Sequence, residues 1–170
     1  MKVTTFGIKV WRWLSLVLVI GALVWTYSVF PQTVAVDFSD NGLAEKYLEK
    51  EHIFYIVMAL FLLNNVLITG LARHIPKVDQ MHLPILNKKV WAQHREALNE
   101  HLINWLYCLV AVINTIIGMS LFALATINSQ QYKLDVFDFS WLYYVGLGLM
   151  IIVFLLPLRL LWTPDPEDKL

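Results

Sequence analysis

Five histidines are the residues of this chain that could bind a metal or a haem. His74, His82, His94 and His101 lie in one polar stretch, and His52 lies apart from them. Two histidines that ligate a haem must meet at similar depth on facing helices, which this distribution does not favour. His94 and His101 could share a helix face, but no Cys, Asp or Glu completes a ligand set with them. We expect a surface pair and no cofactor.

Motifs for catalysis are missing from the sequence. It contains no HExxH helix, no Gly-rich phosphate loop and no GxSxG elbow. Cys108 is the single cysteine, which excludes an intrachain disulfide and a cysteine-based metal site. The formal net charge is zero, so no nucleic-acid partner and no polybasic tail is indicated. We therefore expect no enzymatic activity.

Carboxylates are concentrated in the segment 31–51. The acidic residues there are Asp37, Asp40, Glu45, Glu49 and Glu51, against two lysines. No spacing typical of calcium ligands relates them. A solvated acidic cap is our interpretation, and a cation site is the alternative.

The composition indicates an integral membrane protein. Hydrophobic residues make up 58% of the chain and charged residues 15%, whereas a soluble domain carries roughly 25% charged residues. A membrane-spanning helix needs about 20 apolar residues, and four stretches qualify: 13–30, 52–72, 102–127 and 139–161. We predict one all-α membrane domain over residues 1–170, a four-transmembrane-helix bundle. No Asp, Glu, Lys or Arg lies in the middle of a span, which disfavours ion-coupled transport.

The distribution of basic residues predicts the orientation. Lys and Arg in short loops favour the cytoplasmic side, and most of them lie before the first span, between the second and third, and after the fourth. Trp and Tyr near the span ends fit two interfacial belts. Both termini should face the cytoplasm. The alternative is that the first span is a cleaved signal peptide, although its apolar run is long and no small-x-small site precedes Pro31.

The two longer loops carry secondary-structure signals. In the outer loop 31–51, Val34, Val36 and Phe38 alternate as in a strand, residues 40–42 form a turn, and residues 43–51 suggest a turn or two of helix.

In the cytoplasmic loop 73–101, we predict an amphipathic surface helix that bends into the third span. Asn87 would cap it, and its apolar face would carry Trp91, Leu98, Leu102 and Trp105. That face could rest on lipid headgroups or bind a protein. The tail 163–170 is predicted to be disordered.

Three amides are predicted to lie near the membrane centre: Asn64, Asn65 and Asn114. Because an unpaired amide in hydrocarbon costs several kcal/mol, they should find partners inside the bundle. A structural hydrogen bond between the second and third spans is our interpretation, and a ligand pocket is the alternative.

The third span also carries a stripe of mostly small residues at alternating four and three spacing. It consists of Asn104, Cys108, Ala111, Thr115, Gly118, Phe122 and Ala125. Small residues let helix backbones approach closely, so we predict that this face packs on another helix. Gly146 and Gly148 could act similarly in the fourth span, and Pro157 could kink its end.

The first loop resembles a bacterial domain-of-unknown-function family that also occurs in membrane proteins of the SdpI toxin-immunity type. The resemblance rests on Pro31, Val34, Val36, Phe38 and Gly42. Further short matches are Lys50, Phe54-Tyr55, Leu83-Pro84, Asn87-Lys88 and Trp91. Two departures are Asp37, where the family has histidine, and Ala35, where a second proline is common. The resemblance implies a bacterial cytoplasmic membrane protein and no defined activity.

Three functional hypotheses follow. The first is a non-enzymatic accessory or binding subunit that contacts the lipid bilayer and other membrane subunits, or a second copy of itself. The second is a sensor or immunity factor whose segment 31–42 meets an extracytoplasmic ligand, a hypothesis that rests on family analogy. The third is transport of a small molecule through an oligomer.

Overall fold

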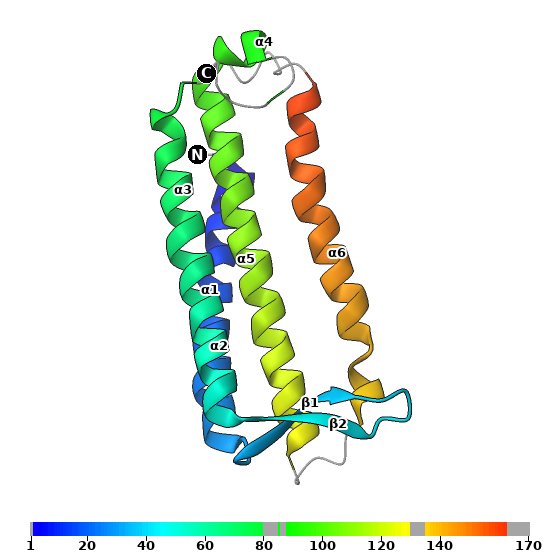
Figure 1. The fold of residues 1–170 in the computed structure, drawn as a ribbon. Coiled ribbons are helices and arrows are strands. Elements are labelled where there is room, and N and C mark those ends of the chain that lie inside the picture. Colours follow the sequence, from blue (N-terminus) through cyan, green and yellow to red (C-terminus); the bar gives the residue numbers. More distant parts are fainter. Residues whose placement is uncertain (1, 80–84, 86–87, 130–134, 163–170) are drawn as a thin grey trace.

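Helices dominate the computed structural model, which describes residues 2–79, 85, 88–129 and 135–162 (Figure 1). Within these residues, four helical segments are long and apolar enough to cross a membrane, as predicted. They are α1 (Val3–Val29); α2 (Lys50–Leu62), continued by a π-helical turn (Leu63–Ile68) and α3 (Thr69–His74); α5 (Arg95–Asn128); and α6 (Trp141–Leu155).

Two of these helices begin seven or more residues before the predicted spans. α1 starts at Val3 and α5 at Arg95, because Lys, Arg and Glu form helix as readily as apolar residues do and no proline interrupts either start. The boundaries of the apolar run therefore do not coincide with the boundaries of the helix. In consequence Arg12 and Glu100 lie inside helices.

The last helix changes its winding near Pro157. α6 gives way to 3₁₀ turns over Leu156–Leu161, because proline lacks the amide hydrogen that an α-helical bond requires.

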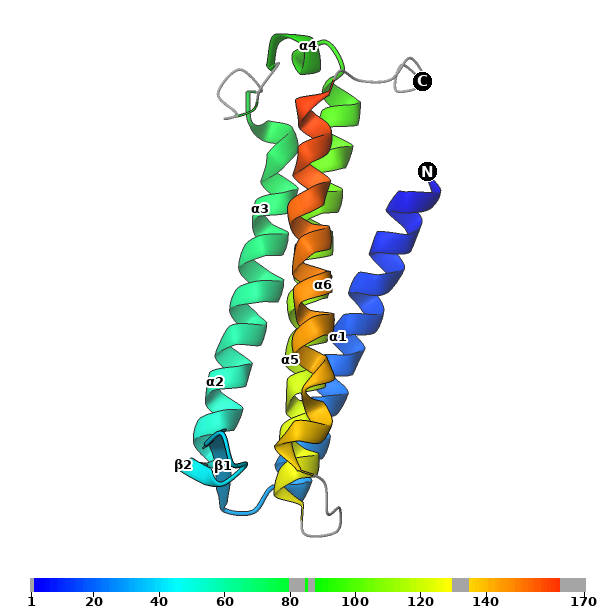
Figure 2. The same ribbon diagram turned by 90° about the vertical axis from the view of Figure 1, so that its right-hand side faces the viewer.

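α5 is the central helix of the fold, and the other three lie around it (Figures 1 and 2). In the most apolar stretch of α5, half of the residues are buried inside the structure. The corresponding share is 17% for α1, 17% for the α2–α3 segment and 11% for the segment of α6. α1 packs along most of α5, whereas α6 rests chiefly on α5 alone. The predicted four-helix bundle is thus an open arrangement in which α6 has one principal neighbour.

A β-hairpin crosses the end of the helices where α1 stops and α2 starts (Figure 1). β1 (Thr33–Phe38) pairs antiparallel with β2 (Ala44–Glu49), from Thr33 opposite Glu49 to Phe38 opposite Ala44. Gly42 has a positive φ of 75° in the connecting turn, a conformation that costs glycine little. The predicted strand and turn are confirmed.

The helical turns predicted over 43–51 are wrong, since β2 occupies most of that segment. Its Glu, Lys, Leu and Ala residues favour helix on their own, but β1 supplies a partner for the backbone groups, and pairing outweighs so weak a local preference. Helix begins only at Lys50.

The predicted amphipathic helix is split in two. α4 (Lys88–Ala92) ends in a turn at Gln93 and His94, and α5 follows directly. The apolar face is covered by the chain itself: Trp91, Leu98 and Leu102 are buried together with Leu160, and the Trp91 indole donates to the Leu160 carbonyl at 3.1 Å. The predicted cap at Asn87 and the tail 163–170 lie outside the described residues.

Candidate functional site

Asn64, Asn65 and Asn114 meet between the π-helical turn and α5. Asn65 and Asn114 exchange hydrogen bonds: Nδ2 of Asn65 donates to Oδ1 of Asn114 at 2.9 Å, and Nδ2 of Asn114 donates to Oδ1 of Asn65 at 3.0 Å. Nδ2 of Asn64 donates to the same Asn114 oxygen at 2.9 Å and to the Val110 carbonyl at 3.1 Å. The three amides thus link two apolar helices.

The π-helical winding explains how two consecutive residues reach one acceptor. In an α-helix, 3.6 residues complete a turn, which separates neighbouring side chains widely. A π-helical turn is wider, with i to i+5 bonds, so Asn64 and Asn65 diverge less and both face Asn114. Asn64 and Asn114 are 2% and 0% exposed. This geometry is that of an interhelical structural contact.

The small-residue stripe of α5 faces α1 over much of its length. Cys108, Ala111 and Ala125 are at most 2% exposed. A Cβ atom on Gly118 would lie 2.8 Å from Cγ of Leu18, so only glycine permits this approach of α1 to α5.

The polar and aromatic members of the stripe differ from its small residues in their contacts. Asn104 donates to Oγ1 of Thr5 at 2.8 Å, and Thr115 accepts from the Trp11 indole at 3.2 Å. Phe122 is 55% exposed and stacks on Trp25, with ring centroids 5.4 Å apart. Gly146 and Gly148 in α6 face open space, so the described helices use neither for close packing.

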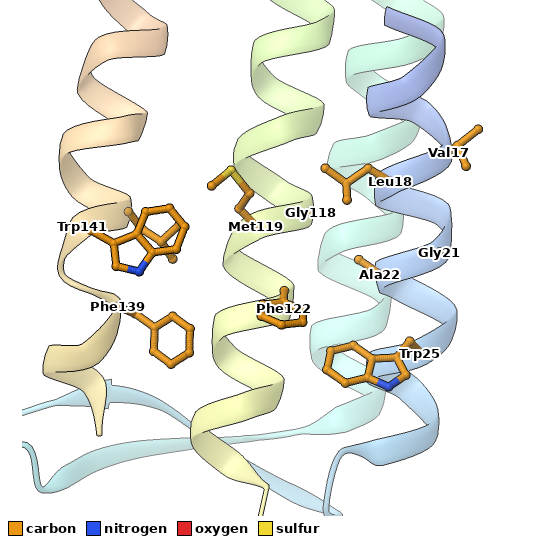
Figure 3. A pocket seen from close by; sticks show the side chains of 11 residues that line it. Val17, Leu18, Gly21, Ala22, Trp25, Gly118, Met119, Phe122, Phe139 and Trp141 are labelled. Atoms are coloured by element: carbon orange, nitrogen blue, oxygen red, sulfur yellow. The ribbon is translucent and has the colours of Figure 1, made fainter. Parts of the chain in front are cut away.

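An apolar groove of about 440 Å³ lies over α5 between α1 and the start of α6 (Figure 3). Its lining comprises Val17, Leu18, Gly21, Ala22, Trp25, Gly118, Met119, Phe122, Phe139, Trp141 and Leu142. A Cβ atom added to Gly21 would meet no other side chain within 4 Å, so the backbone of α1 is accessible there. The groove exists because α1 and α6 both rest on α5 and do not close over it.

A polar cavity of about 250 Å³ lies at the opposite end from the hairpin. Lys2, Thr4, Thr5, Trp91, Ala97, Glu100, His101, Asn104 and Arg159 line it. Thr5 donates to Glu100 at 2.5 Å, and a ring nitrogen of His101 lies 2.8 Å from the Leu156 carbonyl oxygen. His94 is the residue before α5, with a buried Nδ1, so the two histidines occupy different surroundings.

Arg12 is a functional candidate that the sequence prediction placed outside the spans. Its guanidinium lies among three helices: it donates to Oγ1 of Thr69 at 3.2 Å and sits 4.4 Å from the ring centroid of Tyr107. The available signal was the absence of proline between Val3 and Phe30, which allows one uninterrupted helix through Arg12.

Most of the outer-loop motif serves the hairpin. Val34 is 0% exposed and packs in a core cluster with residues of α1, α2 and α5, against which Val36 also lies. Asn128 at the end of α5 binds the hairpin through two hydrogen bonds. Its Oδ1 accepts from the Ala35 amide at 2.8 Å, and its Nδ2 donates to the Ala35 carbonyl at 3.0 Å. The motif therefore anchors β1 to the helices.

The remaining motif residues lie nearer the surface. Pro31 and Asp37 are exposed and Phe38 is half-buried, and the Asp37 carboxylate accepts from the amide of Phe38 at 3.1 Å. A hollow of about 460 Å³ opens between the hairpin and the end of α5, lined by Ala35, Phe38, Gly42, Leu43, Ala44, Tyr47, Ile127, Asn128, Asp135 and Val136.

No family model, curated protein or solved structure matches this chain. Function is therefore inferred from the geometry above, in which the apolar groove and the hollow beside the hairpin each present an accessible surface and Arg12 forms a part-buried contact between helices.

Proposed function

We propose that this protein is a non-enzymatic integral membrane protein that acts by binding, as an accessory subunit of a larger membrane assembly. The observation that carries the proposal is the apolar groove between α1 and α6. A transmembrane helix of another subunit, or of a second copy, is the occupant that we propose for it.

The lining of the groove suits a helix. Association of helices in lipid depends on close packing, and small residues at the contact allow two backbones to approach. Gly21 and Ala22 supply such a surface on α1. Trp25, Phe122 and Trp141 border it with large rings, which bury much area at low entropic cost. A partner helix would fill space that α6 leaves open.

The exposed faces of α6 extend this surface. Val153 is the buried residue within α6, while Leu147, Ile151 and Phe154 are between 48% and 67% exposed. Lipid tails can cover these apolar side chains, and a neighbouring subunit can cover them equally well. A helix held by one principal neighbour offers the rest of its surface for assembly.

The proposed location is the bacterial cytoplasmic membrane, with both termini on the cytoplasmic side. Four crossings return the chain to the side on which it began. The segments from the end of α3 to α4, which carry Arg73, Lys77, Lys88 and Lys89, lie at the same end as the start of α1. The enrichment of positive charge at this end supports the orientation.

The groove proposal predicts that Gly21→Leu weakens assembly. The added side chain would occupy the space intended for a partner backbone, so the fraction of chain that elutes in a complex from a mild detergent should fall several-fold. Gly7→Leu is the matched control, because Gly7 lies on the same helix, also faces open space and lies outside the groove. Light scattering gives the mass, and mass spectrometry identifies copurifying chains.

Two outcomes would contradict the proposal. A wild-type chain that always elutes as a monomer without other proteins would show that no protein partner binds. Equal assembly of the Gly21→Leu and Gly7→Leu chains would show that the groove is not the contact surface, and lipid would then be its occupant.

A second candidate function is recognition of an extracytoplasmic ligand by the hairpin, as in the SdpI-like hypothesis. The hollow beside Phe38 and Tyr47 favours it, because the hairpin that borders it is anchored by Asn128. Changing Asp37 and Asp40 to Asn should then alter protection or signalling in cells that depend on the protein. An unchanged phenotype, with normal protein levels, would count against it.

A further inference from the structure

Arg12 places a permanent positive charge between α1, α3 and α5. One terminal nitrogen donates to Oγ1 of Thr69 at 3.2 Å, and the guanidinium carbon lies 4.4 Å from the centroid of Tyr107. Its Nε is buried and has no hydrogen-bond partner. Because arginine stays protonated in proteins and carries five N–H donors, most of its hydrogen-bonding capacity is unused by these contacts.

No carboxylate among the described residues forms an ion pair with Arg12. Glu100 is an acidic residue of α5, the helix that carries Tyr107, and it accepts from Thr5. Thr5 lies seven residues before Arg12 on α1, and Glu100 lies seven residues before Tyr107 on α5. At about 1.5 Å per residue, the pair of Thr5 and Glu100 is therefore about 10 Å along the helices from Arg12 and Tyr107. A partly buried charge without a counter-ion is unfavourable, so an external anion would stabilise this arrangement.

Further positive charge lies along the chain near Arg12 on α1 and near Thr69 on α3. Lys9 is one turn before Arg12 on α1, and Arg73 is one turn after Thr69 on α3, and residues at these spacings share a helix face. Figure 2 shows that α1 leans away from α3 and α5 toward its N-terminus, so the separation is greatest at this end.

The depth of Arg12 matches the membrane boundary. α1 has 27 residues, about 40 Å of helix, whereas the hydrocarbon core is about 30 Å thick. If the apolar run that starts at Trp13 fills the core, Arg12 lies where the polar headgroups begin. A guanidinium at this level meets lipid phosphates, whose oxygens match its planar fork.

We propose that Arg12, Thr69 and Tyr107 form a binding site for a phosphate-bearing anion, supplied by an anionic phospholipid of the leaflet at this end. Arg12 binds the phosphate oxygens through its free N–H groups. The Tyr107 ring supports the guanidinium plane by a cation–π contact, and Thr69 fixes its rotation. The site is separate from the apolar groove and needs no protein partner.

The test is lipid binding to the purified full-length chain, measured by native mass spectrometry during titration with phosphatidylglycerol or phosphatidylcholine. Arg12→Gln should weaken phosphatidylglycerol binding by about tenfold, the change that one charge-assisted hydrogen-bond contact typically produces. Lys89→Gln is the matched control, since it removes the same charge from an exposed position at the same end. It should bind like the wild type.

Arg12→Lys separates charge from geometry. It keeps the positive charge, so the chain should fold even if Arg12→Gln does not, but it lacks the planar fork. Its affinity for phosphatidylglycerol should fall between those of the wild type and the Gln variant. Wild-type affinity in this variant would overturn the proposed geometry.

Three further results would overturn the proposal. Equal lipid binding by the wild type, Arg12→Gln and Lys89→Gln would show that Arg12 is not the site. Binding of inorganic phosphate as tight as that of phosphatidylglycerol, lost in Arg12→Gln, would make a free phosphate the ligand and not a lipid. Unchanged lipid binding with loss of a copurifying subunit in Arg12→Gln would assign the counter-ion to a protein carboxylate.

Discussion

Single polar side chains decide much of the internal geometry of this protein. Asn114 is 0% exposed, yet its amide oxygen accepts from two other amides and its amide nitrogen donates to one of them. Burial in an apolar environment makes such contacts obligatory, because an amide without a partner bears its full desolvation cost. One residue therefore controls the pairing of three side chains.

Asn114→Leu should lower the thermal stability of the protein. The change leaves the Asn65 and Asn64 amides without their shared acceptor, at a cost of about 1–3 kcal/mol for a buried unsatisfied group. Circular dichroism melting in detergent would measure it as a lower Tm. Ser120→Ala, at an exposed position of the same helix, is the control and should melt like the wild type.

Replacing all three asparagines with leucine provides a second comparison. Removal of every partner in a hydrogen-bonded group can be nearly neutral, so the triple variant should recover part of the stability that Asn114→Leu loses. A single variant that melts with the wild type would show that the amide cluster contributes little.

At the scale of elements, the contact between α1 and α5 depends on one close approach. Gly118 lies so near Leu18 that an added Cβ would be 2.8 Å from Cγ and 3.0 Å from Cδ2 of that side chain. The separation of two helices is set by the side chains at their contact. The position of α1, and with it the depth of the groove floor, follows from a glycine in α5.

Gly118→Ala should destabilise the protein, and Leu18→Ala should relieve the effect. Leu18 is 42% exposed, so its truncation alone should cost little, while the double variant should melt above Gly118→Ala. Residues in contact typically couple by about 0.5–3 kcal/mol in such a cycle. Gly148→Ala, where a Cβ meets open space, is the control. Simple additivity of the two changes would contradict the proposed contact.

At the scale of the whole molecule, four helices of membrane-spanning length place the hairpin and the Arg12 region at opposite ends (Figure 1). If all four helices cross a membrane, the hairpin and the connection from α5 to α6 lie on one side, and both helical termini of the described chain lie on the other. In the orientation that we propose from the excess of Lys and Arg, the second side is the cytoplasm. Each candidate surface would then meet a different environment.

This orientation predicts the labelling of introduced cysteines. In a Cys108→Ser background, a cysteine in place of Glu45 should react with a membrane-impermeant maleimide in intact cells, while one in place of Lys89 should react only after the cells are opened. Both positions are exposed. The wild-type thiol of Cys108 is 2% exposed and should stay unlabelled in the folded protein. The reverse pattern would invert the proposed orientation.

The sequence by itself determined the features that depend on local chemistry. A run of about 20 apolar residues is more stable in lipid than in water whatever surrounds it, so the four spans follow from composition. The strand from Val34 to Phe38 and the turn at Gly42 follow from alternation and from the freedom of glycine at positive φ. Asn64, Asn65 and Asn114 were found because an amide in an apolar run must be paired.

Only the tertiary structure decided what depends on a partner surface. Ala44–Glu49 is a strand because β1 lies beside it, and Trp91 is buried because the end of the chain's last helix covers it. Arg12 lies between three helices because α1 extends past its apolar run and crosses Thr69 and Tyr107. Pairing and packing energies arise between segments distant in sequence, and they outweigh local preferences of a few tenths of a kcal/mol per residue.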